Sequence, residues 1–241
     1  MAESSQEQRV FVRPGFDWAS AAAYLFDIDG TLLNSRDAVH YFAFRHAMRE
    51  VFGIEASIEG VPVHGNTDIG ILRAVLRRHQ LNDHEIDARM PQMLDRMCAE
   101  VRENRDQLQP ELCPSIMELV TWLHQDGKLL GVVSGNLETI GWLKLEKAGL
   151  KRMFSFASFS HPRELRVDIF RHGLALAREK LGAPGPTFVI GDTPSDIEAA
   201  RATGTPVIAL ATGIFSFSDL MACGPDACFA CATDLLQLQN L

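Results

Sequence analysis

The chain of 241 residues is long enough for one large domain, or for a core with a smaller inserted domain. Its hydrophobic content of 46% and charged content of 22% are ordinary for a globular protein that buries a core. The formal net charge of −8 argues against nonspecific binding to nucleic acid or an anionic membrane surface, and no apolar run reaches the ~20 residues of a membrane span.

An apolar run at residues 23–28 predicts the first strand, which ends in two carboxylates. Asp27 and Asp29 lie two residues apart, and side chains at that spacing share one face of a strand. They are expected to converge at the carboxyl end of a buried strand, where open α/β sheets build their sites. Carboxylates this close require that one be protonated or that a cation lie between them. Taken alone, the segment also fits a strand that ends in an acidic turn.

The next segment, residues 34–109, is expected to be almost wholly helical. Apolar side chains recur there at helical spacing in three groups: Tyr41, Phe44, Met48 and Phe52; Ile69, Leu72 and Leu76; and Ile86, Met90, Met93, Met97 and Val101. Pro91 is expected to mark a kink or a helix start. Because the segment is too long for a simple crossover between strands, we interpret it as an inserted cap.

From residue 110 onward the pattern alternates between helices and strands, which predicts a mostly parallel sheet covered on both faces. Strands are expected at 128–133, 154–159, 187–190, 206–210 and 227–230, and helices at 137–148, 195–202 and 234–238. The expected fold class is therefore α/β. Residues 1–33 and 110–241 would form the parallel-sheet core, and residues 34–109 an all-helical cap.

Two of the later strands also end in polar groups. One leads into Ser134, Gly135 and Asn136, and another leads into Asp192, with Asp196 four residues further on. Because the carboxyl ends of parallel strands meet at one edge of a sheet, these groups and the first acidic pair are expected to form one site. The Ser-Gly-Asn sequence also fits an ordinary turn after a strand.

These motifs resemble those of the haloacid dehalogenase-like hydrolases. The DIDGTLL segment is similar to the first motif of that family, VVSGN to the second and GDTPSD to the fourth. The resemblance implies a Rossmann-like core with a helical cap inserted after the first motif. It covers residues 23–210, together with the cap by position and length.

The resemblance implies covalent catalysis at the first motif. Asp27 would be the nucleophile that forms an aspartyl-phosphate, and Asp29 would be the general acid and later the base. Crowding by Asp27 and Asp192 is expected to raise the pKa of Asp29 toward that role. Ser134, with the backbone N–H groups of Gly135 and Asn136, would bind the phosphate.

The same resemblance implies Mg²⁺ as the cofactor. Its ligands would be Asp27, the backbone carbonyl of Asp29, and Asp192, because Mg²⁺ takes oxygen ligands. Asp196 would act as a water-mediated or more distant ligand. The alternative for Asp196 is a helix start, because Ser195 and Glu198 match a capping box.

The third motif departs from the family pattern. The family places a Lys there, whereas the corresponding residues 158–170 contain none. Arg166, next to a predicted helix, is expected to replace that Lys, with Arg163 as the second choice. An arginine supplies a fixed charge and a bidentate fork for phosphate. The missing Lys leaves open a catalytically weak binding or regulatory protein.

In the predicted cap, the VHGNTD sequence resembles a Gly-x-Thr-Asp turn of capped phosphatases. His64, Asn66 and Thr67 are candidates for recognition of the leaving group. The alternative is a loop in which Thr67 or Asp68 caps the next helix.

An odd count of five cysteines and polar first residues unlike a secretion signal argue against a disulfide framework and for a cytoplasmic location. Cys223, Cys228 and Cys231 raise the question of a metal site, but no fourth ligand lies near them. We interpret Cys228 as a small buried apolar side chain.

The leading hypothesis is a Mg²⁺-dependent phosphomonoester hydrolase of a small phosphorylated metabolite, similar in cap type to phosphoglycolate phosphatases. A phosphosugar mutase of the same fold is an alternative. Asp29 disfavours a dehalogenase, and the absence of any Lys before Lys128 disfavours a Schiff-base phosphonatase. No nucleic-acid or membrane partner is expected.

Overall fold

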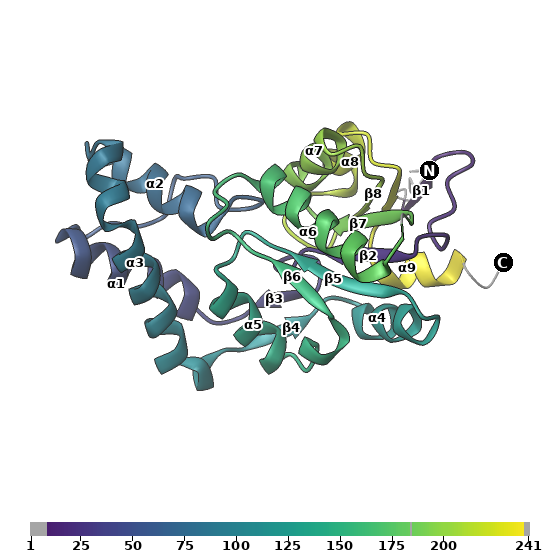
Figure 1. The fold of residues 1–241 in the computed structure, drawn as a ribbon, viewed down its shortest axis with the longest axis horizontal. Helices are drawn as coiled ribbons and strands as arrows, with labels where there is room; N and C mark the ends of the chain where they lie inside the picture. The colour runs from purple at the N-terminus through teal and green to yellow at the C-terminus, as the bar shows by residue number, and fades with distance from the viewer. Residues whose placement is uncertain (1–8, 184, 239–241) are drawn as a thin grey trace, which may run out of the picture.

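The computed structural model describes residues 9–183 and 185–238. A seven-stranded sheet with helices on both faces forms its core (Figure 1). In spatial order the strands are β1 (Val10–Val12), β9 (Ala227–Phe229), β8 (Val207–Leu210), β7 (Thr187–Gly191), β2 (Ala23–Phe26), β5 (Leu129–Val133) and β6 (Phe156–Ser158). All neighbouring pairs are parallel except β1 with β9. The expected α/β class is confirmed.

The side chains of the central strand β2 alternate between two apolar layers. Tyr24 and Phe26 belong to one layer, and Ala23 and Leu25 to the other, as the two-residue period of a strand requires. The helices that cover these layers are α4 (Ile116–Gln125), α5 (Glu138–Lys147) and α9 (Ala232–Gln237) on the first, and α6 (Arg166–Leu181), α7 (Pro194–Ala202) and α8 (Phe217–Ala222) on the second. β2 is therefore covered on both faces, and its tip lies between the tips of β7 and β5.

Three helices between β3 (Leu33–Ser35) and β4 (Pro110–Leu112), hereafter the helical segment, gather at the left of Figure 1. They are α1 (Val39–Phe52), α2 (Asp68–Arg78) and α3 (Asp83–Glu103). Their apolar faces enclose a cluster of their own, to which Leu137 and Ile140 of the core also contribute. The helical segment therefore packs on the core through α5 and the loop before it. The exact domain boundaries stay a prediction.

Pro91 lies inside α3 and does not begin a helix. The start of α3 is set upstream by a reciprocal capping box. Asn82 Oδ1 accepts from the Glu85 N–H at 3.0 Å, and Glu85 Oε2 accepts from the Asn82 N–H at 3.0 Å. These two bonds satisfy backbone donors that would otherwise be orphaned, so the helix forms before the proline is reached.

Several short elements are absent from the sequence-based prediction. β3 (Leu33–Ser35) and β4 (Pro110–Leu112) form an antiparallel pair where the chain leaves the core and returns to it. β1 lies in the expected polar lead-in, α8 lies between β8 and β9, and two 3₁₀ helices cover Arg105–Gln107 and Lys151–Met153. Three-residue strands are too short to show a periodic pattern.

The five cysteines are all free. Cys228 is fully buried in β9, where burial raises the pKa of its thiol to about 12. Cys231 precedes α9, and its Sγ lies 3.5 Å from Asp234 Oδ2. Cys228 therefore packs as a small apolar side chain, as expected.

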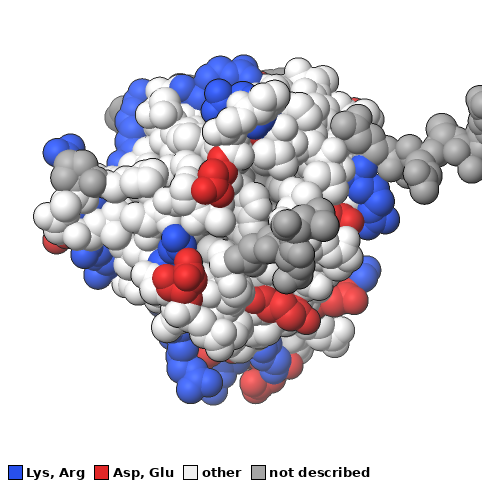
Figure 2. Space-filling model, turned by 90° about the vertical axis from the view of Figure 1, so that its right-hand side faces the viewer, with Lys and Arg blue, Asp and Glu red and all other residues white. Residues whose placement is uncertain are grey.

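Two further observations concern the outside of the molecule. Within residues 9–183 and 185–238, no helix is both long and apolar enough to cross a membrane. Figure 2 shows the face of the core remote from the helical segment, where acidic and basic side chains are interspersed.

Candidate active site

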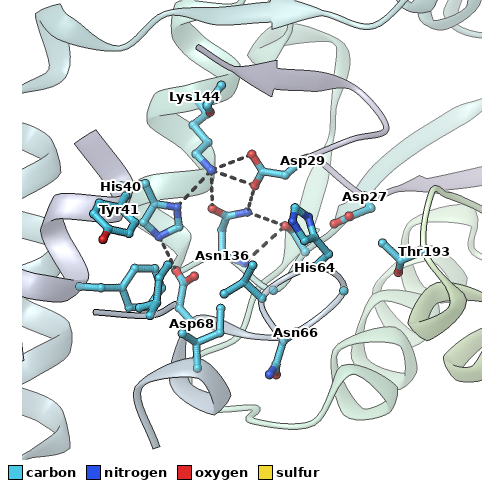
Figure 3. A pocket seen from close by; sticks show the side chains of 18 of the residues that line it. Asp27, Asp29, His40, Tyr41, His64, Asn66, Asp68, Asn136, Lys144 and Thr193 are labelled. Atoms are coloured by element: carbon cyan, nitrogen blue, oxygen red, sulfur yellow. Dashed lines mark hydrogen bonds and ion pairs between the residues drawn. The ribbon is translucent and has the colours of Figure 1, made fainter. Parts of the chain in front are cut away.

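The tips of three neighbouring strands bring the predicted residues together. Asp27 follows β2, Ser134 follows β5 and Asp192 follows β7, and β2 pairs with both of the other strands in parallel register. The Asp27 N–H donates to Ile190 O at 3.0 Å, which extends this register one residue beyond the strand. A cavity of about 260 Å³ opens above the tips, and Asp27, Asp29 and Ser134 line it (Figure 3).

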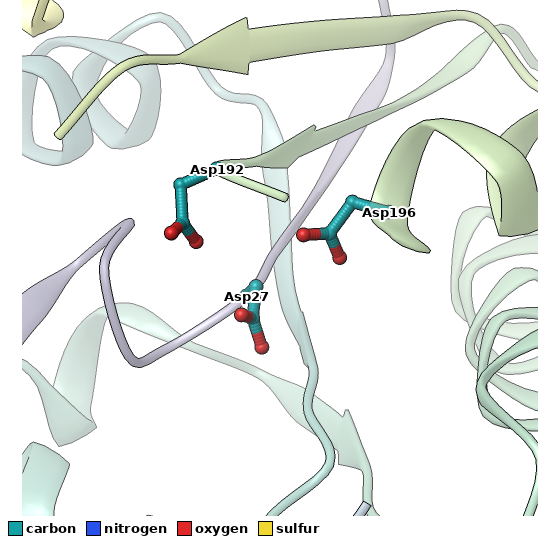
Figure 4. Close-up of side chains that lie close together, drawn as sticks. All are labelled: Asp27, Asp192 and Asp196. Carbon is teal, nitrogen blue, oxygen red and sulfur yellow. The ribbon is translucent and has the colours of Figure 1, made fainter. Parts of the chain in front are cut away.

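Three carboxylates form a buried cluster at this edge. Asp27, Asp192 and Asp196 each present an oxygen within 4.8 Å of the others (Figure 4). Burial raises the pKa of Asp27 to about 6 against the opposing charge of Arg166, and Asp196 and Asp29 raise it further. Burial, followed by the charges of Asp196 and Asp27, raises the pKa of Asp192 well above its usual range. This excess of negative charge favours a bound cation.

Asp196 forms a capping box, but with Thr193 and not through Ser195 and Glu198 as the sequence suggested. Helix α7 begins at Pro194, so Thr193 is the residue that precedes it. Asp196 Oδ2 accepts from the Thr193 N–H at 3.1 Å and from its hydroxyl at 2.7 Å. Asp196 Oδ1 accepts from Arg166 Nε at 2.8 Å. Because both oxygens already have protein donors, a direct metal bond from Asp196 is disfavoured, and its metal role stays a prediction.

Arg166 reaches the predicted nucleophile. It is the first residue of α6, only 9% exposed, and its Nη2 lies 3.0 Å from Asp27 Oδ2. Although burial opposes its charge, Asp196 and Asp27 keep the pKa of Arg166 above its usual range. Among the contacts of the described residues, none joins Arg163 to Asp27. Arg166 therefore contacts Asp27 directly, and its replacement of the missing Lys stays a prediction.

The surroundings of Asp29 differ from the sequence-based expectation. Its carboxylate accepts from Lys144 Nζ, 2.8 Å from both oxygens, and from Asn136 Nδ2 at 2.7 Å. Burial alone would raise the pKa of Asp29, but the Lys144 charge and these hydrogen bonds outweigh it and lower the pKa. The prediction that neighbouring aspartates raise this pKa is therefore wrong, because an ammonium group contacts the carboxylate directly.

Sequence analysis did not identify Lys144. This side chain, only 2% exposed, lies on α5 one helical turn after the buried Ile140. A lysine on the apolar face of a helix was the available signal, because residues four apart share a face.

The loop after β5 is built around a hydroxyl and an amide. Asn136 Nδ2 donates to Ser134 Oγ at 2.9 Å as well as to Asp29. Gly135 meets the loop before α2, and its carbonyl accepts from the Asp68 N–H at 2.8 Å. A Cβ on Gly135 would lie only 2.1 Å from the backbone oxygen of Asn66, so only glycine permits this approach.

The candidates in the helical segment divide into two kinds. His64 and Asn66 line the cavity, as leaving-group recognition requires. Thr67 is buried instead and caps α2, where its hydroxyl accepts from the Gly70 N–H at 3.0 Å and donates to Glu164 O at 2.7 Å. For Thr67 the structure favours the capping alternative. The substrate role of all three residues stays a prediction.

The substitution Gly135→Ala tests the contact between the two loops. We expect it to lower kcat/KM for an aryl phosphate by roughly 10²-fold, because the added methyl group displaces the loop by about 1 Å. Circular dichroism should show unchanged secondary structure. Activity equal to that of the wild type would contradict this close approach.

A comparison with known protein families covers most of the core and the helical segment. The family model of the haloacid dehalogenase-like hydrolases matches residues 24–210, from β2 to the end of β8. The chain belongs to this family. The matched residues include Asp27, Ser134, Arg166 and Asp192.

Individual relatives agree with the family. This hydrolase is 27% identical to a phosphoglycolate phosphatase of Synechococcus elongatus over 220 residues, which cover 89% of this chain and 95% of the relative. A Haemophilus somnus structure assigned as a phosphoglycolate phosphatase has a TM-score of 0.65 at 21% identity, and the match covers 92% and 100% of the chains. A Bacteroides vulgatus structure assigned as a β-phosphoglucomutase has a TM-score of 0.64 at 22% identity, covering 94% and 90%.

These matches confirm three of the predictions. The hydrolase is a member of the expected family, it has the expected Rossmann-like α/β fold, and it is a phosphatase.

Proposed function

We propose that this phosphatase hydrolyses a small phosphorylated metabolite, in the manner of phosphoglycolate phosphatases, through an aspartyl-phosphate on Asp27. One observation carries the proposal: the Asp27 carboxylate sits at the tip of β2 beside the buried Arg166 guanidinium, at 3.0 Å. A guanidinium at this distance holds both a carboxylate and a phosphoryl group. A cavity of about 260 Å³ suits a small metabolite.

The reaction uses these residues in two steps. In the first, an Asp27 oxygen bonds to phosphorus and the bond from phosphorus to the ester oxygen breaks. Asp29 stands ionised beside Lys144, so it must first take a proton from solvent, and it passes that proton to the ester oxygen. In the second, water attacks phosphorus, Asp29 takes the proton from the water, and phosphate leaves Asp27. Arg166 offsets negative charge on the phosphoryl group throughout.

The donor set fits a magnesium ion. Asp27 and Asp192 offer carboxylate oxygens, and the backbone bonds of the turn after β2 run to Ile28 O and Leu33 O. Among the described residues, no backbone donor occupies the carbonyl of Asp29, which leaves it as a third oxygen ligand. When bound, the ion stabilises negative charge on the phosphoryl oxygens.

Chelation tests the metal. We expect excess EDTA to lower turnover of p-nitrophenyl phosphate on the order of 10³-fold, since such an ion contributes several kcal/mol of charge stabilisation. Excess Mg²⁺ should restore the rate, and Na⁺ at the same ionic strength should not. Turnover that resists EDTA would contradict the metal dependence.

A mutase of the same fold is the second candidate, supported by the β-phosphoglucomutase-like neighbour. A mutase returns the phosphoryl group to a sugar hydroxyl, whereas a hydrolase releases it to water. Measuring free phosphate against transferred phosphate, with sugar phosphates as substrates, separates the two. The buried Arg166 beside Asp27 disfavours an inactive binding protein. The substrate partner and the cytoplasmic location remain predictions.

A further inference from the structure

The buried Lys144 has no role in the two reaction steps above, but it contacts the acid–base residue Asp29. Its Nζ lies 2.8 Å from both oxygens of Asp29, 3.0 Å from Asn136 Oδ1 and 3.2 Å from His40 Nδ1 (Figure 3). An ammonium group has three N–H donors. Each donor therefore has one partner residue, and none of the three is left unused.

These contacts are what allows Lys144 to be buried. A buried ammonium is costly unless it is paired and hydrogen-bonded, and Lys144 is only 2% exposed. The Asp29 side chain is 42% exposed, so Asp29 depends less on this contact for its solvation than Lys144 does. The lysine therefore depends on Asp29 for its burial, whereas Asp29 gains a fixed orientation.

His40 brings the helical segment into this site. The ring stacks on Phe44 of the same helix, with centroids 5.0 Å apart. Because Nδ1 faces the lysine donor, it acts as the acceptor and the proton belongs on Nε2. His40 Nε2 lies 3.2 Å from Asp68 Oδ2, without hydrogen-bond alignment, and that oxygen accepts from the Leu137 N–H at 2.7 Å.

We propose that Lys144 is a positioning residue for the acid–base carboxylate Asp29, and that His40 of the helical segment completes its site. This inference rests on the proposed function. Lys144 and Asn136 hold the Asp29 carboxylate from two directions, so its oxygens keep one orientation toward the leaving group. The contact with His40 means that the site is complete only when α1 lies against α5.

The substitution Lys144→Met tests the role through the leaving group. Phenyl phosphate and p-nitrophenyl phosphate have nearly the same shape, but only phenolate needs a proton in order to leave readily. Because kcat/KM covers the steps up to transfer to Asp27, it reports the acid step. We expect a loss on the order of 10²-fold for phenyl phosphate and less than about threefold for p-nitrophenyl phosphate.

Two more variants complete the experiment. Lys147→Met, on the exposed side of the same helix, should leave kcat/KM for both substrates unchanged. His40→Phe keeps a ring against Phe44 but removes the acceptor, so we expect the same selective loss at roughly tenfold. It also tests the role if Lys144→Met does not fold, which thermal unfolding will reveal.

The results separate this inference from the proposed function. An equal loss on both substrates in Lys144→Met and His40→Phe would mean a merely structural lysine and would overturn the positioning role, while the phosphatase assignment stands. No loss on phenyl phosphate in either variant would also overturn it. A wild-type protein that hydrolyses neither substrate would overturn the proposed function itself.

Discussion

Asp27→Asn is expected to abolish the release of phosphate from p-nitrophenyl phosphate and to leave the fold intact. An amide of the same shape is not a nucleophile toward phosphorus, and removal of a nucleophile costs on the order of 10⁴-fold or more in kcat. Because burial raises the pKa of Asp27 to about 6, a neutral side chain is well tolerated at this position. Steady-state kinetics and a thermal unfolding curve measure the two effects.

The control for this variant is Asp106→Asn, whose side chain is 93% exposed and does not line the cavity. It should retain full activity and stability. A second readout is covalent: wild-type protein quenched in acid during turnover should carry a phosphate adduct, and Asp27→Asn should carry none. Undiminished turnover in Asp27→Asn would end the assignment of Asp27 as the nucleophile.

Arg166→Met is expected to lower both activity and stability. The substitution leaves the Asp27 and Asp196 carboxylates buried without their cation, which costs about 3–5 kcal/mol when a buried pair is broken. We expect kcat/KM for p-nitrophenyl phosphate to fall about 10³-fold, because the phosphoryl charge also loses its clamp. Phosphate release and chemical denaturation provide the two measurements.

The stability loss in Arg166→Met should depend on pH. Without the guanidinium, burial keeps the pKa of Asp27 above its unfolded value, so the folded state binds more protons. Such a group stabilises the fold at low pH and loses that contribution as the pH rises through the folded pKa. The variant should therefore be closest to wild type near pH 5 and furthest from it near pH 8.

Two controls decide which arginine acts at the third motif. Arg166→Lys keeps the positive charge but loses the bidentate guanidinium contact with phosphate, so it should retain part of the activity. Arg163→Met should leave kcat/KM close to that of the wild type, because no described contact joins Arg163 to Asp27. A larger loss in Arg163→Met than in Arg166→Met would reverse the assignment.

The parts of the site that follow strands were predictable from the sequence. Asp27, Ser134 and Asp192 each come directly after a buried apolar run, and parallel strands necessarily bring their carboxyl ends to one edge. Arg166 was chosen because the family resemblance calls for a cation at the third motif and Arg166 lies next to a predicted helix there. The family pattern then supplied the expected chemistry for these positions.

Other parts depend on three-dimensional contacts that no local pattern encodes. Lys144, which is 115 residues away in the chain, lowers the pKa of Asp29. An expectation based on Asp27 and Asp192 alone therefore predicted a pKa shift of the wrong sign. Thr193 caps α7 because the helix starts at Pro194, and helix ends are the least certain part of any pattern. β1 is only three residues long, and its pairing with β9 joins segments more than 200 residues apart, which no local pattern reveals.

The contact between Gly135 and the loop before α2 also bears on how enzymes of this kind diverge. That contact consists of main-chain atoms, since Gly135 O accepts from the Asp68 N–H and Asn66 O lies against Gly135. Only a substitution at Gly135 itself would widen it, since a Cβ there would meet the backbone oxygen of Asn66. Side chains that line the cavity without making this backbone contact, among them His64 of the loop and Tyr41 and Phe44 of α1, can be exchanged to change substrate preference while the loop keeps its place.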